Sequence, residues 1–325
     1  MSELYPIRFE PVYRDYIWGG EKIGRKYERT HNLDRMAESW EISDRTDGMS
    51  VALNGFWKGK SLQEIHKKMG EELMGKGRDF SSFPLLIKLI DARENLSIQV
   101  HPNETTAPSL QGEAKSELWY VLHSDPGAVV YAGLKPGIYE EKFTDEIRSP
   151  NFPDMLEQIE VHPHDVIYVP GGCVHAVGAG CLLLEVQQNS DTTYRIYDWD
   201  RKHTTGKKRD LHHKEALAAI DWKAAQAKAV PHKISSDLHH TLWMALSAPH
   251  FVVQRVEVYD TWHIPHHFDT FQIFFCMEGE GEISVGGKGE KIQAGMTYLL
   301  PAACRSGEIK GRCDVLWITL EGHRL

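Results

Sequence analysis

Three side chains that could hold a metal ion lie in two neighbouring segments of the sequence. Gln99 and His101 are two residues apart, so in a strand both side chains would lie on one face. That strand ends at Pro102, and a second predicted strand begins with Glu117. Two adjacent strands could therefore direct an amide oxygen, an imidazole and a carboxylate at one point. This donor set predicts a metal site that lacks one ligand.

A histidine further along the chain stands in a strand-turn-strand context. Residues 166–169 form an apolar run that predicts a buried strand, and Pro170-Gly171-Gly172 predicts a tight turn before His175. The P-x-G-x-x-H spacing resembles the second metal motif of the cupin superfamily. That resemblance implies a small double-stranded β-helix with the metal inside it. It also implies four metal ligands, namely Gln99, His101, Glu117 and His175.

The elements around these residues are predicted mainly as strands. Residues 83–91 are almost wholly apolar and predict a buried strand. Lys88 lies within it, and a buried ammonium group must find an anion or lose its charge. Residues 181–188 predict another strand, which contains Glu185. Helices are expected at 61–75, 137–147 and 210–228. The first of them begins with the capping-box sequence S-L-Q-E.

Composition and charge exclude one class of partner. The 325 residues are 41% hydrophobic and 26% charged, which is typical of a soluble globular protein large enough for two domains. The formal net charge is −9 and no long basic run occurs, so we expect no nucleic-acid partner. An anionic substrate would need a local cationic pocket.

Cysteine usage and hydropathy bear on the cellular compartment. None of the five cysteines forms a C-x-x-C pair, so reduced thiols and a cytoplasmic location are expected. The N-terminal residues lack the basic and apolar regions of a signal peptide. No apolar stretch approaches about 18 residues, so we expect no membrane span.

Two domains are predicted, at 1–235 and 236–325. The second is expected to be a degenerate cupin barrel, because the stretch from Gly295 to Pro301 repeats the cupin pattern only weakly. Ser306 stands where His175 stands in the first barrel, and Gln272 lies where an upstream carboxylate would be expected. The fold class is therefore predicted as mainly β, with two cupin (double-stranded β-helix) barrels and a few peripheral helices. We expect the second barrel to bind no metal.

Several local motifs together resemble one family, the type I mannose-6-phosphate isomerases in their short bacterial form. The motifs are W-G-G, A-E-S-W-E-I-S, P-L-L-I-K-L-I-D-A, L-S-I-Q-V-H-P-N, K-S-E-L-W-Y, V-P-G-G-C-V-H-A and N-S-D-T-T-Y-R-I-Y-D. The resemblance covers most of the chain and implies one Zn²⁺ per chain. It also implies interconversion of mannose 6-phosphate and fructose 6-phosphate by proton transfer through a cis-enediol. Longer members carry a helical insertion between Glu117 and His175, most of which this chain lacks.

Three cations are candidates for the sugar-phosphate site. Arg195 matches the catalytic arginine of the family, and would hold the phosphate or stabilise an enediolate. Lys88 matches a second active-site lysine of the family. Lys115 lies two residues before Glu117, so it would share the strand face of that ligand. Fixed cations are what a phosphate group needs.

Three further residues complete the predicted site. Glu185 is a candidate acid or base, although a structural hydrogen bond to a ligand is an alternative role. Ser97 would face the same way as Gln99 and is expected to contact substrate. Trp18 precedes two glycines, and is assigned either to a substrate pocket or to an ordinary turn. The proton-abstracting base is not assigned. We expect a sugar-phosphate substrate and a monomer or weak homodimer.

Two other functions fit parts of the pattern. Two histidines and one carboxylate would suit Fe(II) in a cupin dioxygenase, which oxygen uptake and metal analysis would detect. A non-enzymatic sugar-binding bicupin would bind ligand without turnover. It would not need Lys88 or Lys115 inside the pocket.

Overall fold

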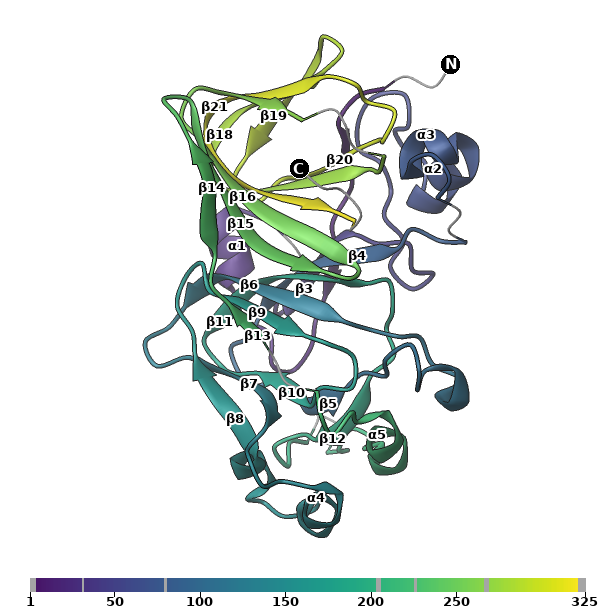
Figure 1. Cartoon of the computed structure of the whole chain (residues 1–325), viewed down its shortest axis with the longest axis vertical. Helices are drawn as coiled ribbons and strands as arrows, with labels where there is room; N and C mark the ends of the chain where they lie inside the picture. Colours follow the sequence, from purple (N-terminus) through teal and green to yellow (C-terminus); the bar gives the residue numbers. More distant parts are fainter. Residues whose placement is uncertain are drawn as a thin grey trace. The chain divides into compact units, whose positions relative to one another are not determined.

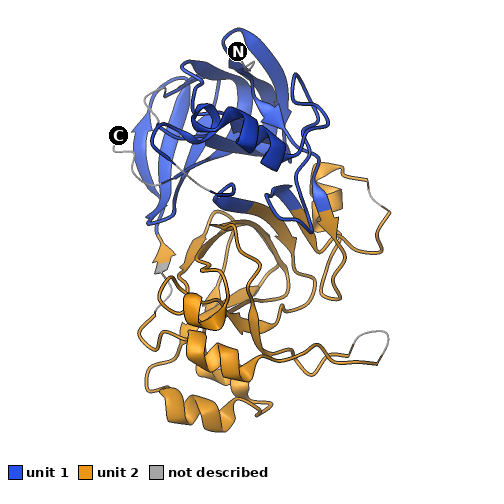
Figure 2. Ribbon diagram, turned by 90° about the vertical axis from the view of Figure 1, so that its right-hand side faces the viewer, with its two compact units in different colours: residues 1–12, 40–86, 230–325 blue, residues 13–39, 87–229 orange. Residues whose placement is uncertain are grey.

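The computed structural model describes residues 4–30, 32–78, 81–202, 206–224, 227–265 and 269–320. Antiparallel strands in three sheets dominate it, with a few short helices, so the predicted mainly β class is confirmed. The chain divides into two compact units, each built from segments that are distant in the sequence (Figure 2). Unit 1 comprises Met1–Val12, Trp40–Leu86 and Val230–Leu325, and unit 2 comprises Tyr13–Ser39 and Ile87–Ala229.

The last boundary between the units lies close to the predicted division at residues 235 and 236. Two N-terminal segments, Met1–Val12 and Trp40–Leu86, belong to unit 1 together with the C-terminal strands. The predicted division cuts the chain once and therefore assigns these segments to the first domain. These groups record which residues contact one another. The two predicted domains, 1–235 and 236–325, stay a prediction.

A nine-stranded antiparallel sheet forms most of unit 1 (Figure 1). Its order is β1-β20-β18-β21-β16-β15-β14, with β17 paired to β21 and β19 paired to β18. The bounds are β1 Ile7–Arg8, β14 His232–Ser236, β15 His240–Ala248, β16 Phe251–Val258, β17 Thr261–Ile264, β18 Gln272–Val285, β19 Lys288–Gln293, β20 Thr297–Leu300 and β21 Gly307–Thr319.

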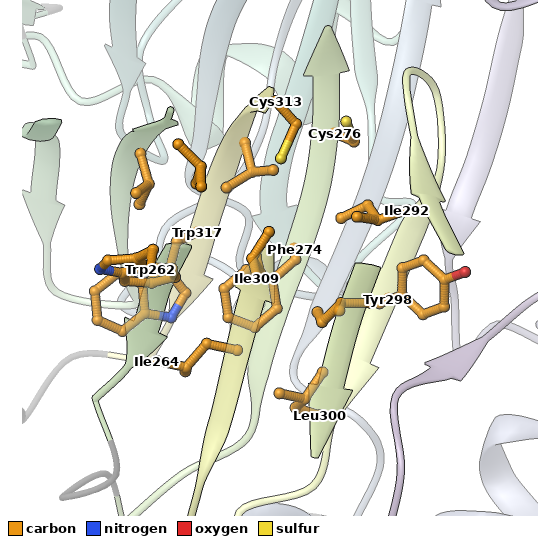
Figure 3. Close-up of a cluster of buried hydrophobic side chains, with 14 of the residues drawn as sticks. Trp262, Ile264, Phe274, Cys276, Ile292, Tyr298, Leu300, Ile309, Cys313 and Trp317 are labelled. Atoms are coloured by element: carbon orange, nitrogen blue, oxygen red, sulfur yellow. The ribbon is translucent and has the colours of Figure 1, made fainter. Parts of the chain in front are cut away.

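The core of unit 1 is a cluster of large apolar side chains contributed by these strands (Figure 3). Trp262 and Trp317 meet edge to face with ring centroids 5.1 Å apart, and Phe274 stacks on Trp317 at 6.4 Å. Phe274 and Cys276 are two residues apart on β18, so both project into the cluster. Large side chains thus fill the inner face of this sheet.

Two short helices belong to unit 1, at the position where one helix is predicted. They are α2 Leu62–Met69 and α3 Glu71–Met74. The capping box of α2 is present: the Glu64 backbone N–H donates to Ser61 Oγ, and the Ser61 N–H donates to the Glu64 carboxylate. Gly70, with a φ of 52°, divides the predicted helix into two.

Unit 2 contains a five-stranded sheet and most of a seven-stranded sheet. Their orders are β12-β5-β10-β7-β8 and β13-β9-β6-β11-β4-β3-β2. The chain passes from one unit to the other within β2 Val12–Arg14, β3 Glu38–Ile42 and β4 Leu85–Asp91. The remaining bounds are β5 Ile98–Val100, β6 Glu117–Ser124, β7 Val129–Leu134, β8 Leu156–Glu160, β9 Val166–Val169, β10 His175–Val177, β11 Cys181–Gln188, β12 Tyr194–Tyr197 and β13 Ala227–Ala229.

The helices of unit 2 are short. They are α1 Lys22–Tyr27, α4 Glu140–Glu146 and α5 His213–Ala219, with 3₁₀ turns at η1 Pro108–Leu110 and η2 Phe152–Met155. Helix α4 confirms the helix expected at 137–147. None of the helices in the described ranges has the length and apolar character needed to cross a membrane.

The prediction of one helix over 210–228 is wrong in its extent. Helix α5 stops at Ala219, and Ile220 is extended. The Asp221 N–H donates to the Gly172 carbonyl at 3.0 Å, and β13 then pairs with β9. Residues 225 and 226 lie outside the described part of the chain. Tertiary hydrogen bonds therefore override the local preference for a longer helix.

Candidate metal centre

Predicted site residues lie side by side on the five-stranded sheet. Strand β5 lies between β10 and β12 (Figure 1), and Gln99 pairs with His175 on one side and with Arg195 on the other. Residues paired across antiparallel strands project from the same face. His101, two positions beyond Gln99, shares that face. The sheet thus brings three predicted ligands and the predicted arginine together.

The other predicted residues lie on the seven-stranded sheet. Glu117 begins β6 and pairs with Gln187 on β11, and Trp119 pairs with Glu185. The spacing of two positions on each strand puts all four side chains on one face. Lys88 lies on β4, the next strand after β11 in the sheet. Its ammonium group contacts Glu185, so it belongs to the same group.

The two sheets together enclose a compact donor set. His101 Nε2 lies 3.4 Å from Glu117 Oε2, and His175 Nε2 lies 3.4 Å from Glu117 Oε1. The candidate ligand atoms of these three residues all lie within 4.8 Å of one another. Each residue is about 1% exposed. Among the described residues, this is the one group of His, Cys, Asp and Glu side chains arranged closely enough to hold a metal ion.

The hydrogen bonds of the two histidines fix which ring nitrogen is available. His101 Nδ1 lies 2.8 Å from the Thr192 carbonyl, and His175 Nδ1 lies 2.8 Å from the Cys173 carbonyl. Because a carbonyl oxygen only accepts, each ring carries its proton on Nδ1 and presents the lone pair of Nε2. A carbonyl partner for the second nitrogen is typical of metal-binding histidines.

Two of the donor atoms lack the protein partners that buried polar atoms normally have. His101 Nε2 and Glu117 Oε1 are buried without a hydrogen-bond partner among the described residues, whereas Glu117 Oε2 forms an ion pair with Lys115 Nζ at 3.0 Å. Such orphaned acceptors are costly unless another group satisfies them. Two neutral imidazoles and one carboxylate are a donor set that suits Zn²⁺. The residues present therefore fit a divalent cation.

Burial and local charge keep these donors in the forms that bind metal. Burial, assisted by the Lys115 ammonium, lowers the pKa of His101 to about 3. Burial likewise lowers the pKa of His175. For Glu117, burial alone would raise the pKa, but Lys115 and the two histidines hold it well below its usual range. The imidazoles are neutral and the carboxylate is charged at neutral pH.

Gln99 lies beside the three donors with its amide nitrogen toward them. Its Nε2 is 3.3 Å from His175 Nε2, while its Oε1 accepts a hydrogen bond from Ser97 at 3.3 Å. A metal ligand must be the amide oxygen, since the amide nitrogen has no free lone pair. Rotation of the carboxamide by half a turn would exchange the two atoms. The role of Gln99 as a fourth ligand stays a prediction.

A buried cation-anion pair adjoins the donor set. Lys88 Nζ lies 3.3 Å from Glu185 Oε1, and Trp119 Nε1 donates to Glu185 Oε2 at 3.1 Å. Burial opposes the charge of Lys88, but Glu38, Glu185 and Glu117 together raise its pKa. Burial and the neighbouring Glu117 raise the pKa of Glu185. A proton held between such groups is available for acid-base chemistry.

Two further predicted residues meet next to Gln99. Arg195 is partly buried, and its Nε donates to Ser97 Oγ at 3.3 Å while its Nη1 donates to the Asp210 carbonyl at 3.0 Å. Burial, and then the nearby Arg209, lower the pKa of Arg195. The guanidinium therefore lies in a cation-rich part of the site, suited to an anionic group.

Trp18 has a packing role in the structure. It is 3% exposed and belongs to a hydrophobic cluster that includes Trp119. The glycines after it permit close approach of other residues: a Cβ on Gly19 would lie 2.6 Å from Ala37 Cβ, and one on Gly20 would clash with the Asp91 carboxylate. The predicted substrate contact of Trp18 stays a prediction.

Sequence reasoning missed one buried residue and one ion-pair cluster near the site. Gln187 is fully buried, and the alternation of strand 181–188 would have placed it on the face of Glu185. Asp198 forms ion pairs with Arg201 and Arg209. No periodic pattern in the sequence marked that cluster.

In unit 1, Gln272 stands where a metal-binding carboxylate would be expected, and it stabilises the fold instead. Gln272 is buried, and its Oε1 accepts a hydrogen bond from Trp317 Nε1 at 2.9 Å. The amide oxygen therefore satisfies a buried indole within the apolar cluster of Figure 3.

Two parts of the chain match known families. Residues 7–132 match the catalytic domain of type I phosphomannose isomerases. Residues 244–320 match the cupin domain of mannose-6-phosphate isomerases, which agrees with the predicted cupin character of the C-terminal strands.

Whole-chain similarities extend these matches. The chain is 33% identical over 317 residues to the mannose-6-phosphate isomerase ManA of Bacillus subtilis, covering 96% of this chain and 98% of that protein. A crystal structure of the mannose 6-phosphate isomerase from Bacillus subtilis has a TM-score of 0.90 at 30% identity, covering 96% of this chain and 99% of that one. A zinc-bound mannose 6-phosphate isomerase shares the fold, with a TM-score of 0.78 at 15% identity over 98% of this chain and 100% of that one.

Proposed function

The chain belongs to the type I phosphomannose isomerase family, and on that premise we propose that it is a zinc-dependent isomerase of mannose 6-phosphate and fructose 6-phosphate. The proposed route is proton transfer through a cis-enediol. The observation that carries the proposal is the buried group of His101, Glu117 and His175, whose candidate ligand atoms all lie within 4.8 Å of one another.

His101, Glu117 and His175 would hold the zinc ion, with Gln99 as the proposed fourth ligand. The carbonyls of Thr192 and Cys173 orient the two imidazoles before any metal binds. When bound, zinc would supply a Lewis acid that polarises the sugar carbonyl without redox chemistry.

The cations of the site provide for the anionic substrate and for the charge that develops during proton transfer. Lys115 is buried just before β6, and its Nζ lies 3.0 Å from Glu117 Oε2. Lys88 holds Glu185 in a charged pair, and we assign this pair to acid-base chemistry. Arg195, beside Ser97, is assigned to the phosphate or the enediolate oxygen.

We also propose one zinc ion per chain, bound in the N-terminal region of residues 1–235. The support is the group of His101, Glu117 and His175 there and the engagement of Gln272 with Trp317 in the C-terminal strands. Metal analysis of purified protein tests this stoichiometry. Two tightly bound metal ions per chain would contradict it.

The test of the activity is incubation of zinc-loaded protein with mannose 6-phosphate, scored for fructose 6-phosphate. Turnover in D₂O should place one deuterium at C1 of the fructose 6-phosphate product, because the proton abstracted from C2 exchanges with solvent before the enediol is reprotonated at C1. Protein stripped of metal by a chelator should be inactive, and its activity should return when zinc is added. Oxygen uptake with bound iron would instead favour the dioxygenase, and binding without turnover would favour a sugar-binding protein.

A further inference from the structure

Gln187 occupies a buried position beside the metal centre. It is 0% exposed and pairs directly with Glu117 across β6 and β11, so both side chains share one face. A fully buried amide side chain requires hydrogen-bond partners to offset the loss of water. The partners of Gln187 therefore indicate its role.

Both hydrogens of the Gln187 amide nitrogen are used by the turn that follows β11. Nε2 donates to the Gln188 carbonyl at 2.8 Å and to the Ser190 carbonyl at 2.7 Å. Two carbonyl acceptors fix the orientation of the amide, since only the nitrogen can donate to them. The side chain thus clamps the turn formed by residues 188–192.

That turn carries the partner of a proposed metal ligand. The Thr192 backbone N–H donates to Ser190 Oγ at 3.2 Å, and the Thr192 carbonyl accepts the Nδ1 proton of His101 at 2.8 Å. Ser190 is 1% exposed, so the connection is shielded from water. A continuous set of hydrogen bonds therefore leads from Gln187 to the His101 ring.

The turn is also tied to the segment that precedes Glu117. Ser190 Oγ donates to the Glu113 carbonyl at 3.1 Å, and the Glu113 N–H donates to Thr192 Oγ1 at 2.9 Å. The Ser116 N–H donates to Gln188 Oε1 at 2.8 Å. The 188–192 turn consequently contacts both His101 and the segment that leads into Glu117.

We propose that Gln187 is a positioning residue of the metal centre, which clamps the 188–192 turn so that the Thr192 carbonyl holds the proton of His101 on Nδ1. This inference rests on the proposed function, because it concerns how the metal ligands are presented. Its supporting observation is that the amide oxygen of Gln187 is buried without a partner among the described residues. Both donors of the amide nitrogen are engaged by the turn, so the nitrogen carries the contacts by which Gln187 acts on it.

The test compares Gln187→Met with wild type in the metal-free protein. Methionine keeps the length of the side chain and removes both donors. In protein labelled with ¹⁵N-histidine, the His101 ring of wild type should carry its proton on Nδ1, and the variant should show the Nε2-protonated form as well. The zinc dissociation constant, measured by competition with a chelator, should rise about 10- to 100-fold. Ser190→Ala should also weaken zinc binding and populate the Nε2-protonated form of His101. It replaces Gln187→Met in the test if that variant fails to fold.

The matched control is Gln272→Met, which also removes a buried glutamine hydrogen bond but lies in unit 1. It should lower the melting temperature and leave both the His101 tautomer and the zinc affinity unchanged. The inference would be overturned if Gln187→Met lowered the melting temperature but kept the His101 tautomer and the zinc affinity of wild type. Absence of zinc binding in wild type would overturn the proposed function, whereas the tautomer would still decide the role of Gln187.

Discussion

Replacement of Lys115 by Met should destabilise the metal-free protein and strengthen zinc binding. Lys115 Nζ lies 3.0 Å from Glu117 Oε2, and the side chains are 5% and 1% exposed. Methionine preserves most of the apolar stem and removes the charge. The change therefore leaves Glu117 as a buried carboxylate without its closest cation.

The size of the effect follows from the distance and the burial. Two unit charges 3.0 Å apart attract by about 5.5 kcal/mol at an effective dielectric constant of about 20. Removal of one partner from a buried pair costs about 3–5 kcal/mol, because the other charge stays desolvated. We expect the metal-free variant to lose about 3 kcal/mol of unfolding free energy, at the lower end of that range.

The zinc-bound protein should respond in the opposite sense. There, Glu117 has a dication as its partner, and the Lys115 ammonium repels that dication. If the repulsion between Lys115 and zinc amounts to about 1.4 kcal/mol or more, its removal would lower the zinc dissociation constant at least tenfold. Turnover should fall nonetheless, because a cation proposed for the substrate is absent.

Two measurements on the same preparations check this prediction. Chemical denaturation in chelator reports the stability of the metal-free protein, and chelator competition reports zinc affinity. Lys22→Met is the control, since its pair with Asp125 at 2.7 Å is 27% and 51% exposed. Such a surface pair contributes about 0–1 kcal/mol. If Lys115→Met bound zinc more weakly and the stability of the metal-free protein were unchanged, the proposed roles of Lys115 in stabilising Glu117 and repelling zinc would be refuted.

Three further predictions follow from the geometry of the site. His175→Ala should lose zinc and isomerase activity together, as measured by metal analysis and turnover; activity in a verified metal-free sample contradicts this. Arg195→Ala should keep zinc while kcat/KM falls about 30- to 1,000-fold, the loss expected for about 2–4 kcal/mol of charge-assisted stabilisation; near-wild-type kcat/KM would exclude a catalytic role. Burial alone would raise the pKa of Asp198, but hydrogen bonds from Arg209 and Arg201 hold it below its usual range. Its stabilising contribution is therefore present above the unfolded pKa of about 3.9 and lost as pH falls through the folded pKa. Asp198→Asn should destabilise the protein at neutral pH and flatten its acid unfolding profile; a profile like that of wild type contradicts the assignment.

Apolar runs and local hydrogen-bond motifs were the parts of the fold that the sequence allowed us to predict most closely. The strand expected at 181–188 is β11 Cys181–Gln188, because an unbroken buried run leaves little choice of conformation. The capping box at Ser61 and Glu64 is local and needs no tertiary information. The resemblance to the cupin metal motifs implied that His101, Glu117 and His175 lie together, and their candidate ligand atoms do lie within 4.8 Å of one another.

Features set by contacts between distant segments were not predictable in this way. Helix α5 ends early because Asp221 pairs with Gly172 and β13 pairs with β9, neither of which a local pattern records. The partner of Gln187 is the turn that follows its own strand, but its relation to Glu117 depends on strand register. The orientation of the Gln99 amide depends on Ser97 and on His175 of the neighbouring strand. Each of these requires the assembled sheets.

The distribution of the three metal donors over two sheets has a kinetic consequence. His101 and His175 meet Glu117 only once the five-stranded and seven-stranded sheets have closed on each other. A transition state for folding in which the sheets have not yet closed contains no zinc site, so zinc cannot stabilise it. Zinc should then leave the refolding rate of the chain almost unchanged and slow its unfolding. The metal would thus prolong the lifetime of the native protein without helping the chain to reach it.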